Sequence, residues 1–273
     1  MQTFALADLA SDRRRSSIVL PPIFDSQGTQ TDYLRALRAM LRGISAEVRQ
    51  NIIPAAEAEL ATARDRLQRD MNSRAFDLLS SVTRALVEVA ERLVERILQT
   101  ERRRHTRRWL GTVRSALGID MAAVVRDEDL DGYLETAVTR NVGLIQSLAD
   151  DTVSGVRAAV TNAILQGRTA AQLRKDLTAR FGIADRRAKT IARDQIAKTT
   201  SDLNRIRHQQ AGITEYVWMT SQDERVRALH RSLEGKEYAY GQPTGAEQGL
   251  PPGQPINCRC VGKAIVRFNG VRV

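Results

Sequence analysis

The residues best suited to chemistry gather in residues 218–260, near the end of the 273-residue chain. This stretch holds both cysteines, within Asn257-Cys258-Arg259-Cys260, and His230, one of the three histidines. Zinc prefers thiolate and imidazole as protein ligands, and enzymes use the same two groups as nucleophile and base. The sequence therefore offers either a metal site or a catalytic site here.

The zinc hypothesis uses Asp223, His230, Cys258 and Cys260. The two cysteines stand two residues apart on a predicted strand, so both thiols point to one face of it. Asp223 and His230 are two helical turns apart, so Asp223 has to reach back to the thiols, or another group such as His208 is the fourth ligand. On this hypothesis a structural Zn²⁺ ion clamps the helix to the strand, and no other cofactor is expected.

A purely structural arrangement of the same residues is the alternative. The thiols then fill space, His230 and Asn257 hydrogen-bond the loop backbone, and Asp223 pairs with Arg225 or Arg259. A disulfide is not expected, because Cα atoms two apart on a strand lie about 6.6 to 6.8 Å from each other, at the upper limit for the bond.

An enzyme is a weaker interpretation. Histidine followed by asparagine and cysteine is typical of zinc-assisted nucleases, but the sequence lacks their paired histidines. It also contains no glycine-rich phosphate loop and no evident carboxylate pair. We predict that the chain is not an enzyme, and a metal-dependent nuclease remains an alternative.

The elements that must position these residues form a compact α+β module over residues 213–273. Alternation of β-branched and aromatic residues predicts strands at 213–220, 236–240 and 258–268. The capping box Ser221-x-x-Glu224 predicts a short helix that carries His230 and ends at Gly235. Residues 241–256 hold four of the seven prolines and form a loop.

The segment before this module, residues 168–212, predicts a helical hairpin. Thr169 can cap its first helix, Phe181-Gly182 ends that helix, and Asp185 can cap the second. Two helices around a short turn also fit a helix-turn-helix, which would make the chain a DNA-binding module.

The remainder predicts helices and an arm. Residues 1–30, with the basic triplet Arg13-Arg14-Arg15, show no period and predict an extended arm that lies on a partner or is disordered. In residues 31–167 apolar residues recur at steps of three and four, which predicts a helical stalk or bundle. Its first helix begins at Thr31 or Asp32 and kinks or ends at Pro54. An unbroken helix over residues 55–117 would be about 90 Å long and would have to pack on the same chain, on copies of itself or on a partner.

Composition agrees with a mainly α-helical fold. Aromatic residues supply only 4% of the chain, so aliphatic helix packing is the expected core. The net charge of +10 favours an anionic partner. However, residues 116–165 carry eight acidic and three basic side chains, whereas residues 168–211 carry four acidic and eleven basic side chains. The acidic segment and the basic segment can therefore form ion pairs with each other within the fold. No export signal or membrane-spanning run is visible, and we expect no membrane partner.

The carboxyl-terminal motifs resemble a known family. Asp223-x-Arg225-Val226-Arg227-x-x-His230-x-x-Leu233-x-Gly235, the loop Pro251-Pro252-Gly253 and Asn257-Cys258-Arg259-Cys260 are similar to the signature of the Mu F-like head morphogenesis proteins, the minor head proteins of tailed bacteriophages. The resemblance covers roughly residues 168 to 268. Where the family often has Arg-Thr-Glu on the preceding helix, this chain has Arg193-Asp194-Gln195.

The resemblance implies a structural minor capsid protein that acts in procapsid assembly. It implies binding to the portal protein and the head interior beside the major capsid protein, hence a place in the virion after assembly in the bacterial cytoplasm. From the charge we add packaged DNA as a neighbour, and from the long predicted helix we add self-association. The alternatives are a DNA-binding module and a metal-dependent nuclease that acts on phage DNA.

Overall fold

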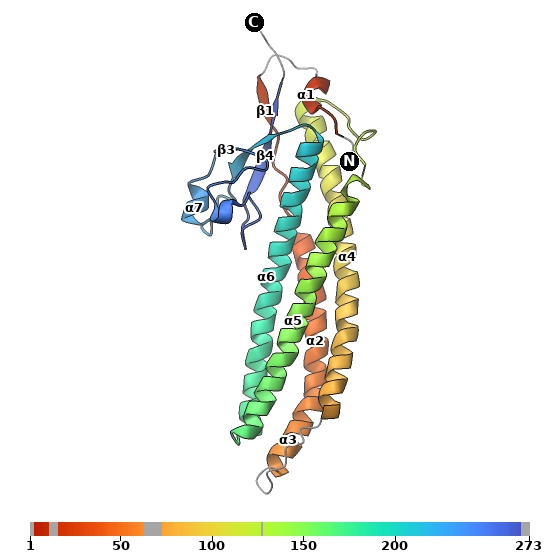
Figure 1. Ribbon diagram of the computed structural model, residues 1–273, viewed down its shortest axis with the longest axis vertical. Helices are drawn as coiled ribbons and strands as arrows, with labels where there is room; N and C mark the ends of the chain where they lie inside the picture. The colour runs from red at the N-terminus through yellow and green to blue at the C-terminus, as the bar shows by residue number, and fades with distance from the viewer. Residues whose placement is uncertain (1–2, 11–15, 63–72, 127, 269–273) are drawn as a thin grey trace. The chain divides into compact units, whose positions relative to one another are not determined.

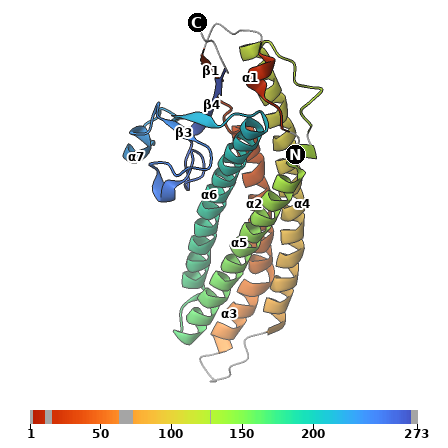
Figure 2. The same cartoon turned by 45° about the horizontal axis from the view of Figure 1, so that its top comes forward.

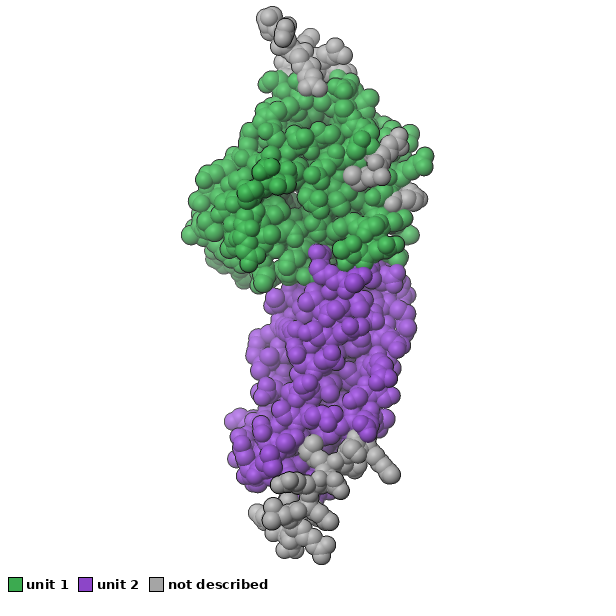
Figure 3. All heavy atoms as spheres, viewed as in Figure 1, with its two compact units in different colours: residues 1–30, 98–137, 193–273 green, residues 31–97, 138–192 purple. Residues whose placement is uncertain are grey.

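The computed structural model describes residues 3–10, 16–62, 73–126 and 128–268. The chain divides into two compact units (Figure 3). Unit 1 comprises residues 1–30, 98–137 and 193–273, and unit 2 comprises residues 31–97 and 138–192. The fold is mainly α-helical with a small carboxyl-terminal α+β part, which confirms the predicted fold class. Within the described residues, no helix has the length and apolar character needed to cross a membrane.

Unit 2 is a bundle made from parts of five helices: α2 (Gln27–Glu47), α3 (Ile53–Thr62), α4 (Ser73–Leu117), α5 (Asp131–Leu165) and α6 (Ala170–Gln210). Both views show α2, α4, α5 and α6 side by side in this unit (Figures 1 and 2). Buried aliphatic side chains line the inner faces, as the periods of three and four predicted. Members of this core include Leu37, Ile44, Leu79, Val94, Ile145, Val156, Leu173 and Ala188.

Helix α2 begins earlier than predicted. It starts at Gln27, and the cap is Ser26, whose hydroxyl accepts a hydrogen bond from the backbone N–H of Thr29 at 3.2 Å. The prediction of Thr31 or Asp32 as the cap is therefore wrong. Pro54 does mark an irregularity, because a π-helix (Val48–Ile52) separates α2 from α3. Proline has no backbone N–H, and the wider turn before it accommodates that missing donor.

The predicted single rod over residues 55–117 is wrong. Gly43 of α2 faces Leu86 of α4 so closely that a Cβ on Gly43 would lie 2.6 Å from Cδ1 of Leu86. A straight helix would carry residue 86 about 48 Å beyond Pro54, which is incompatible with this contact. Helix α4 therefore packs against α2 of the same chain, although the segment of residues 63–72 between α3 and α4 lies outside the described residues.

The predicted hairpin at residues 168–212, and with it the helix-turn-helix, is wrong. Helix α6 runs without interruption from Ala170 to Gln210 and passes through Gly182. Thr169 caps it as predicted. The Thr169 hydroxyl accepts a hydrogen bond from the backbone N–H of Gln172, and the Gln172 side-chain oxygen accepts one from the backbone N–H of Thr169. Asp185 caps nothing and instead pairs with both guanidinium nitrogens of Arg38.

Ion pairs within unit 2 join the basic and acidic segments of the sequence. Arg187 of α6 binds Asp151 of α5, and its second nitrogen donates to Ser147 at 2.9 Å. Part of the positive charge of the basic segment is therefore neutralised within unit 2, at its surface.

A buried hydrogen bond in unit 2 gives a first prediction. Tyr33 is fully buried, and its hydroxyl donates to Asn141 Oδ1 at 2.5 Å. We expect Tyr33→Phe to lower the free energy of unfolding by about 1 to 2 kcal/mol, because the acceptor loses a buried donor. Chemical denaturation would measure it, with Arg35→Ala as the control, since Arg35 is 70% exposed and should change stability by less than about 0.5 kcal/mol. Equal effects of the two substitutions on the free energy of unfolding would show that the buried hydrogen bond does not stabilise the fold.

Unit 1 is organised around a four-stranded antiparallel sheet in the order β1-β4-β2-β3. The strands are β1 (Ser17–Val19), β2 (Glu215–Met219), β3 (Glu237–Ala239) and β4 (Val261–Arg267). Two short helices, α1 (Leu6–Leu9) and α7 (Ala228–Arg231), belong to the same unit. The strands predicted at residues 213–220 and 236–240 are confirmed, and the last strand begins three residues later than predicted.

The amino-terminal segment is part of unit 1. Strand β1 pairs with β4, and the backbone N–H groups of Phe4 and Leu6 donate to the carbonyls of Gln210 and Ala211. Leu6 and Leu20 are buried in a core cluster around Trp109. For the described residues the expectation of an arm on a partner, or of disorder, is wrong. The basic triplet Arg13-Arg14-Arg15 lies outside them.

Candidate metal centre

The candidate site lies in unit 1, where the turn before β4 meets α7. His230 belongs to α7 and is 2% exposed. The predicted helix from Ser221 begins only at Ala228, because Asp223 closes a turn there by accepting the backbone N–H of Arg225 at 2.9 Å. Cys258 and Cys260 precede β4 and are also buried.

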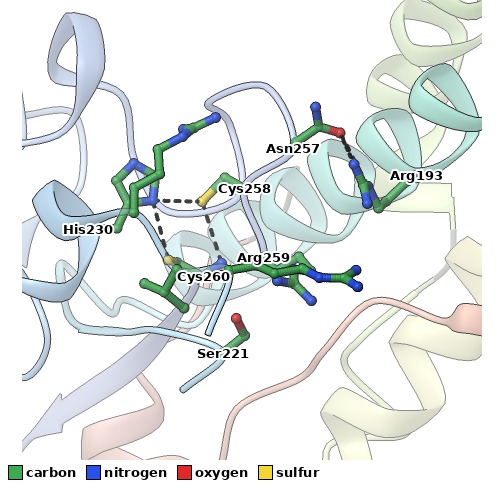
Figure 4. A pocket seen from close by; sticks show the side chains of 10 residues that line it. Arg193, Ser221, His230, Asn257, Cys258, Arg259 and Cys260 are labelled. Carbon is green, nitrogen blue, oxygen red and sulfur yellow. Dashed lines mark hydrogen bonds between the residues drawn. The ribbon is translucent and has the colours of Figure 1, made fainter. Parts of the chain in front are cut away.

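The two thiols converge with the imidazole of His230. Nδ1 of His230 lies 3.5 Å from Sγ of Cys258 and 3.6 Å from Sγ of Cys260. The three potential ligand atoms all lie within 4.8 Å of one another, and Figure 4 shows the side chains pointing to one place. The predicted convergence is therefore present, but its cause is a turn, because both cysteines stand outside the strand whose alternation was expected to align them.

The turn is built by residues around the thiols. The backbone N–H of Cys258 donates to the Pro255 carbonyl at 2.9 Å, and Asn257 adopts a left-handed φ of 59°. Asparagine tolerates this conformation better than most residues. The sulfur of Cys258 then accepts the backbone N–H groups of Gly253 and Cys260, both at 3.4 Å.

These contacts give the two thiols different pKa values. The hydrogen bond from Cys260 and the two backbone donors lower the pKa of Cys258 to about 6. The same thiol pair, together with burial, raises the pKa of Cys260. One negative charge is therefore favoured at Cys258 in the absence of any cation, because the N–H groups around it stabilise the thiolate.

Glu247 orients the imidazole from the opposite side. Its carboxylate lies 2.7 Å from Nε2 of His230, and this hydrogen bond lowers the pKa of the Glu247 carboxyl. When Nε2 carries the proton, Nδ1 presents its lone pair to the two sulfurs. Glu247 also binds Arg227 at 3.0 Å, which holds the carboxylate in place.

Asp223, the fourth predicted ligand, does not join this cluster. Its Oδ1 binds the guanidinium of Arg259 at 2.6 Å, which is one of the pairings that the sequence left open. The alternative ligand His208 is buried elsewhere in unit 1, with its Nδ1 2.5 Å from the Tyr240 hydroxyl. Among the described residues, the structure brings together three of the four predicted ligands.

Asn257 fastens the turn to helix α6. Its side-chain oxygen accepts two hydrogen bonds from Arg193, and its backbone N–H donates to Asp194 Oδ1 at 3.0 Å. Asp194 also pairs with Lys198 at 2.7 Å. The Arg193-Asp194-Gln195 sequence therefore supplies a carboxylate that holds the loop.

A pocket of about 140 Å³ opens beside the cluster. His230, Cys258 and Cys260 form one part of its lining, and four guanidinium side chains stand around them (Figure 4). These four are Arg193, Arg225, Arg227 and Arg259. The pocket is therefore electropositive and gives solvent or a small anion access to the thiols.

Sequence reasoning missed Glu247, and it named Gly253 in the Pro-Pro-Gly loop without its role in the turn. Glu247 lies in an irregular loop 17 residues from His230, so no local period indicates their contact. Gly253 has a φ of 86°, and a Cβ there would lie 2.8 Å from Cβ of Ser201. Its place directly after two prolines was a signal of this tight turn.

Comparison with known proteins places the site inside a family match. Residues 154–262 match the family described as "Phage Mu protein F like protein". The chain is also 33% identical over 154 residues to a protein of Haemophilus influenzae named "Uncharacterized protein". That alignment covers 55% of this chain and 33% of the relative, so the chain spans about a third of the relative's length. No solved structure matches the chain significantly.

Proposed function

We propose, from the premise that residues 154–262 are a module of the phage Mu protein F-like family, that the chain is a structural protein of head morphogenesis in a tailed bacteriophage. The family match is the observation that carries this proposal. It includes α7, the Pro251-Pro252-Gly253 loop and both cysteines, so the motifs that the sequence singled out lie within the match.

The contacts of these motifs support an architectural role. His230 is held between Glu247 and the two sulfurs, and Arg259 is bound to Asp223. A general base needs a nitrogen or carboxylate free to reach substrate, whereas these groups bond to other parts of the same unit. We therefore propose that the module is a rigid clip in which these side chains hold the fold together.

The finer proposal concerns its partners. We place the chain in the head interior, bound to the portal protein and adjacent to the major capsid protein, with packaged DNA as a neighbour. The net charge of +10 supports an acidic lining or DNA as the facing surface. The exposed apolar residues Leu78 and Val89 of α4 lie on unit 2 and are suited to contact with a protein partner or a second copy.

Fractionation of infected cells tests the head assignment. In lysates of the phage that encodes this chain, we expect the protein to sediment with procapsids and to remain with particles after a high-salt wash. Deletion of its gene should lower the yield of infectious heads. A protein found only in the soluble fraction, with normal heads in its absence, would contradict the assignment.

Binding experiments separate the proposed partners. Purified chain should bind the portal protein, and Leu78→Asp/Val89→Asp should weaken this binding if α4 supplies the surface, while Arg35→Ala serves as the control. Binding to duplex DNA that falls steeply with salt would instead favour the DNA-binding alternative. Metal-dependent nicking of DNA that is lost in His230→Ala would favour a nuclease and overturn the structural function.

A further inference from the structure

We propose that Cys258, Cys260 and His230 bind one zinc ion, with a water molecule from the adjoining pocket as the fourth ligand. This ligand set differs from the one expected from sequence, since Asp223 is replaced by solvent. The site is independent of the identity of the phage partners.

The two separations between nitrogen and sulfur fit a tetrahedral zinc ion. With Zn–S near 2.3 Å and Zn–N near 2.0 to 2.1 Å, a tetrahedral angle separates nitrogen from sulfur by about 3.6 Å. The observed separations of Nδ1 from the sulfurs of Cys258 and Cys260 are 3.5 and 3.6 Å. In such a site the two sulfurs lie about 3.8 Å apart, and here they lie within 4.8 Å, so zinc binding requires at most a modest approach of the sulfurs.

Hydrogen bonding alone accounts poorly for the same arrangement. An imidazole nitrogen has one in-plane lone pair or one proton, so Nδ1 cannot form two well-aligned bonds to two sulfurs. Both sulfurs nevertheless face it at nearly equal distances in a buried site. A cation among the three atoms uses all three lone pairs at once.

The surroundings resemble those that metal-binding residues usually have. A histidine that ligates zinc commonly donates its other ring N–H to a carboxylate, which fixes the tautomer and makes the ligand more basic. Glu247 occupies this position at 2.7 Å from Nε2. The backbone N–H groups of Gly253 and Cys260 point to the Cys258 sulfur, where they stabilise thiolate charge.

The fourth position is open to the pocket. His230, Cys258 and Cys260 all line the cavity of about 140 Å³, which has room for water. The carboxylate of Asp223 is held by Arg259 instead. Zinc binding displaces the remaining thiol proton, on Cys260, to solvent and leaves a neutral unit of Zn²⁺ with two thiolates.

Zinc would join segments that otherwise share a small core. The cluster around Trp218 contains only five buried residues among those described, and two of them are Cys258 and Cys260. The ion links α7 to the end of the 241–260 loop, which has little regular structure. We therefore expect zinc to stabilise this part of unit 1 and to order the loop.

Metal analysis of the full chain, purified without chelator, tests the proposal. We expect about one zinc per chain, and X-ray absorption should show two sulfur neighbours near 2.3 Å with two lighter ones near 2.0 to 2.1 Å. Cys258→Ser and Cys260→Ser should each lower the zinc content at least tenfold. Wild-type protein with less than 0.2 zinc per chain after purification in zinc-supplemented buffer would overturn the proposal.

Asp223→Asn is the matched control, because it alters a polar residue of the same motif outside the three-atom cluster. It should keep one zinc per chain. Loss of zinc in Asp223→Asn, in a protein that remains folded by circular dichroism, would overturn the assignment of water as the fourth ligand.

A second measurement uses only the wild-type protein, so it does not depend on whether the cysteine variants fold. Folded wild-type protein, stripped with a chelator and titrated with cobalt(II), should develop a thiolate-to-metal absorption band that zinc abolishes. Its melting temperature should rise with free zinc concentration, as mass action requires for a ligand that binds the folded state. The absence of both the band and the melting shift would contradict the site.

Discussion

Lowering the pH from 7 to 5 should reduce the free energy of unfolding by about 4 kcal/mol through two buried histidines, His105 and His208. Burial lowers the pKa of His105 to about 4 and that of His208 to about 3. The unfolded chain binds protons at these groups near pH 6.5, whereas the folded protein does not. Their contribution is therefore fully present above pH 6.5 and is lost progressively below it.

The double variant His105→Gln/His208→Gln isolates this effect. Urea denaturation at pH 7 and pH 5 should give a difference between the two pH values that is about 4 kcal/mol smaller in the variant than in the wild type. Glutamine retains a donor for the Asn204 oxygen, which lies 2.8 Å from Nε2 of His105. An identical pH dependence in the two proteins would show that these histidines titrate normally in the folded state.

Arg207→Ala should lower the free energy of unfolding by about 3 to 5 kcal/mol, because it removes one partner of a buried charge network. The guanidinium is fully buried and donates to Gln210 at 2.7 Å, to Thr106 at 3.1 Å and to the Arg126 carbonyl at 2.8 Å. Asp129, whose carboxylate lies 3.7 Å away, would lose this compensating charge.

Two further variants separate charge from local helix effects. Arg205→Ala, two residues earlier on α6, removes a 40% exposed side chain and should change stability by less than about 0.5 kcal/mol. Arg207→Met/Asp129→Asn should recover part of the loss, since it retains volume and removes the uncompensated carboxylate. Equal stability of Arg205→Ala and Arg207→Ala would refute the role assigned to the buried network.

Local patterns in the sequence predicted the helical class and most strands because they reflect burial within one element. They failed at Gly182, because a glycine inside a helix costs only about 1 kcal/mol and packing of α6 in the bundle outweighs it. They failed again at β1, whose partner strand is distant in the sequence. No local signal reports such a pairing.

In the candidate site, too, some residues were predicted from the sequence and others were not. His230, Cys258 and Cys260 were predicted together and are together. Asp223 was misplaced because the sequence does not tell whether a carboxylate turns to a metal or to Arg259. Glu247 was missed because the loop that carries it follows no period.

The pairing of β1 with β4 also determines the order of events during synthesis on the ribosome. Ser17 pairs with Arg267, 250 residues later, so β1 has no partner strand until β4 has been translated. The helices of residues 31–97 and 138–192, by contrast, have all emerged before β2 is made. Nascent chains thus acquire the bundle first and close the sheet last, and a premature stop before residue 261 leaves the amino-terminal strand unpaired.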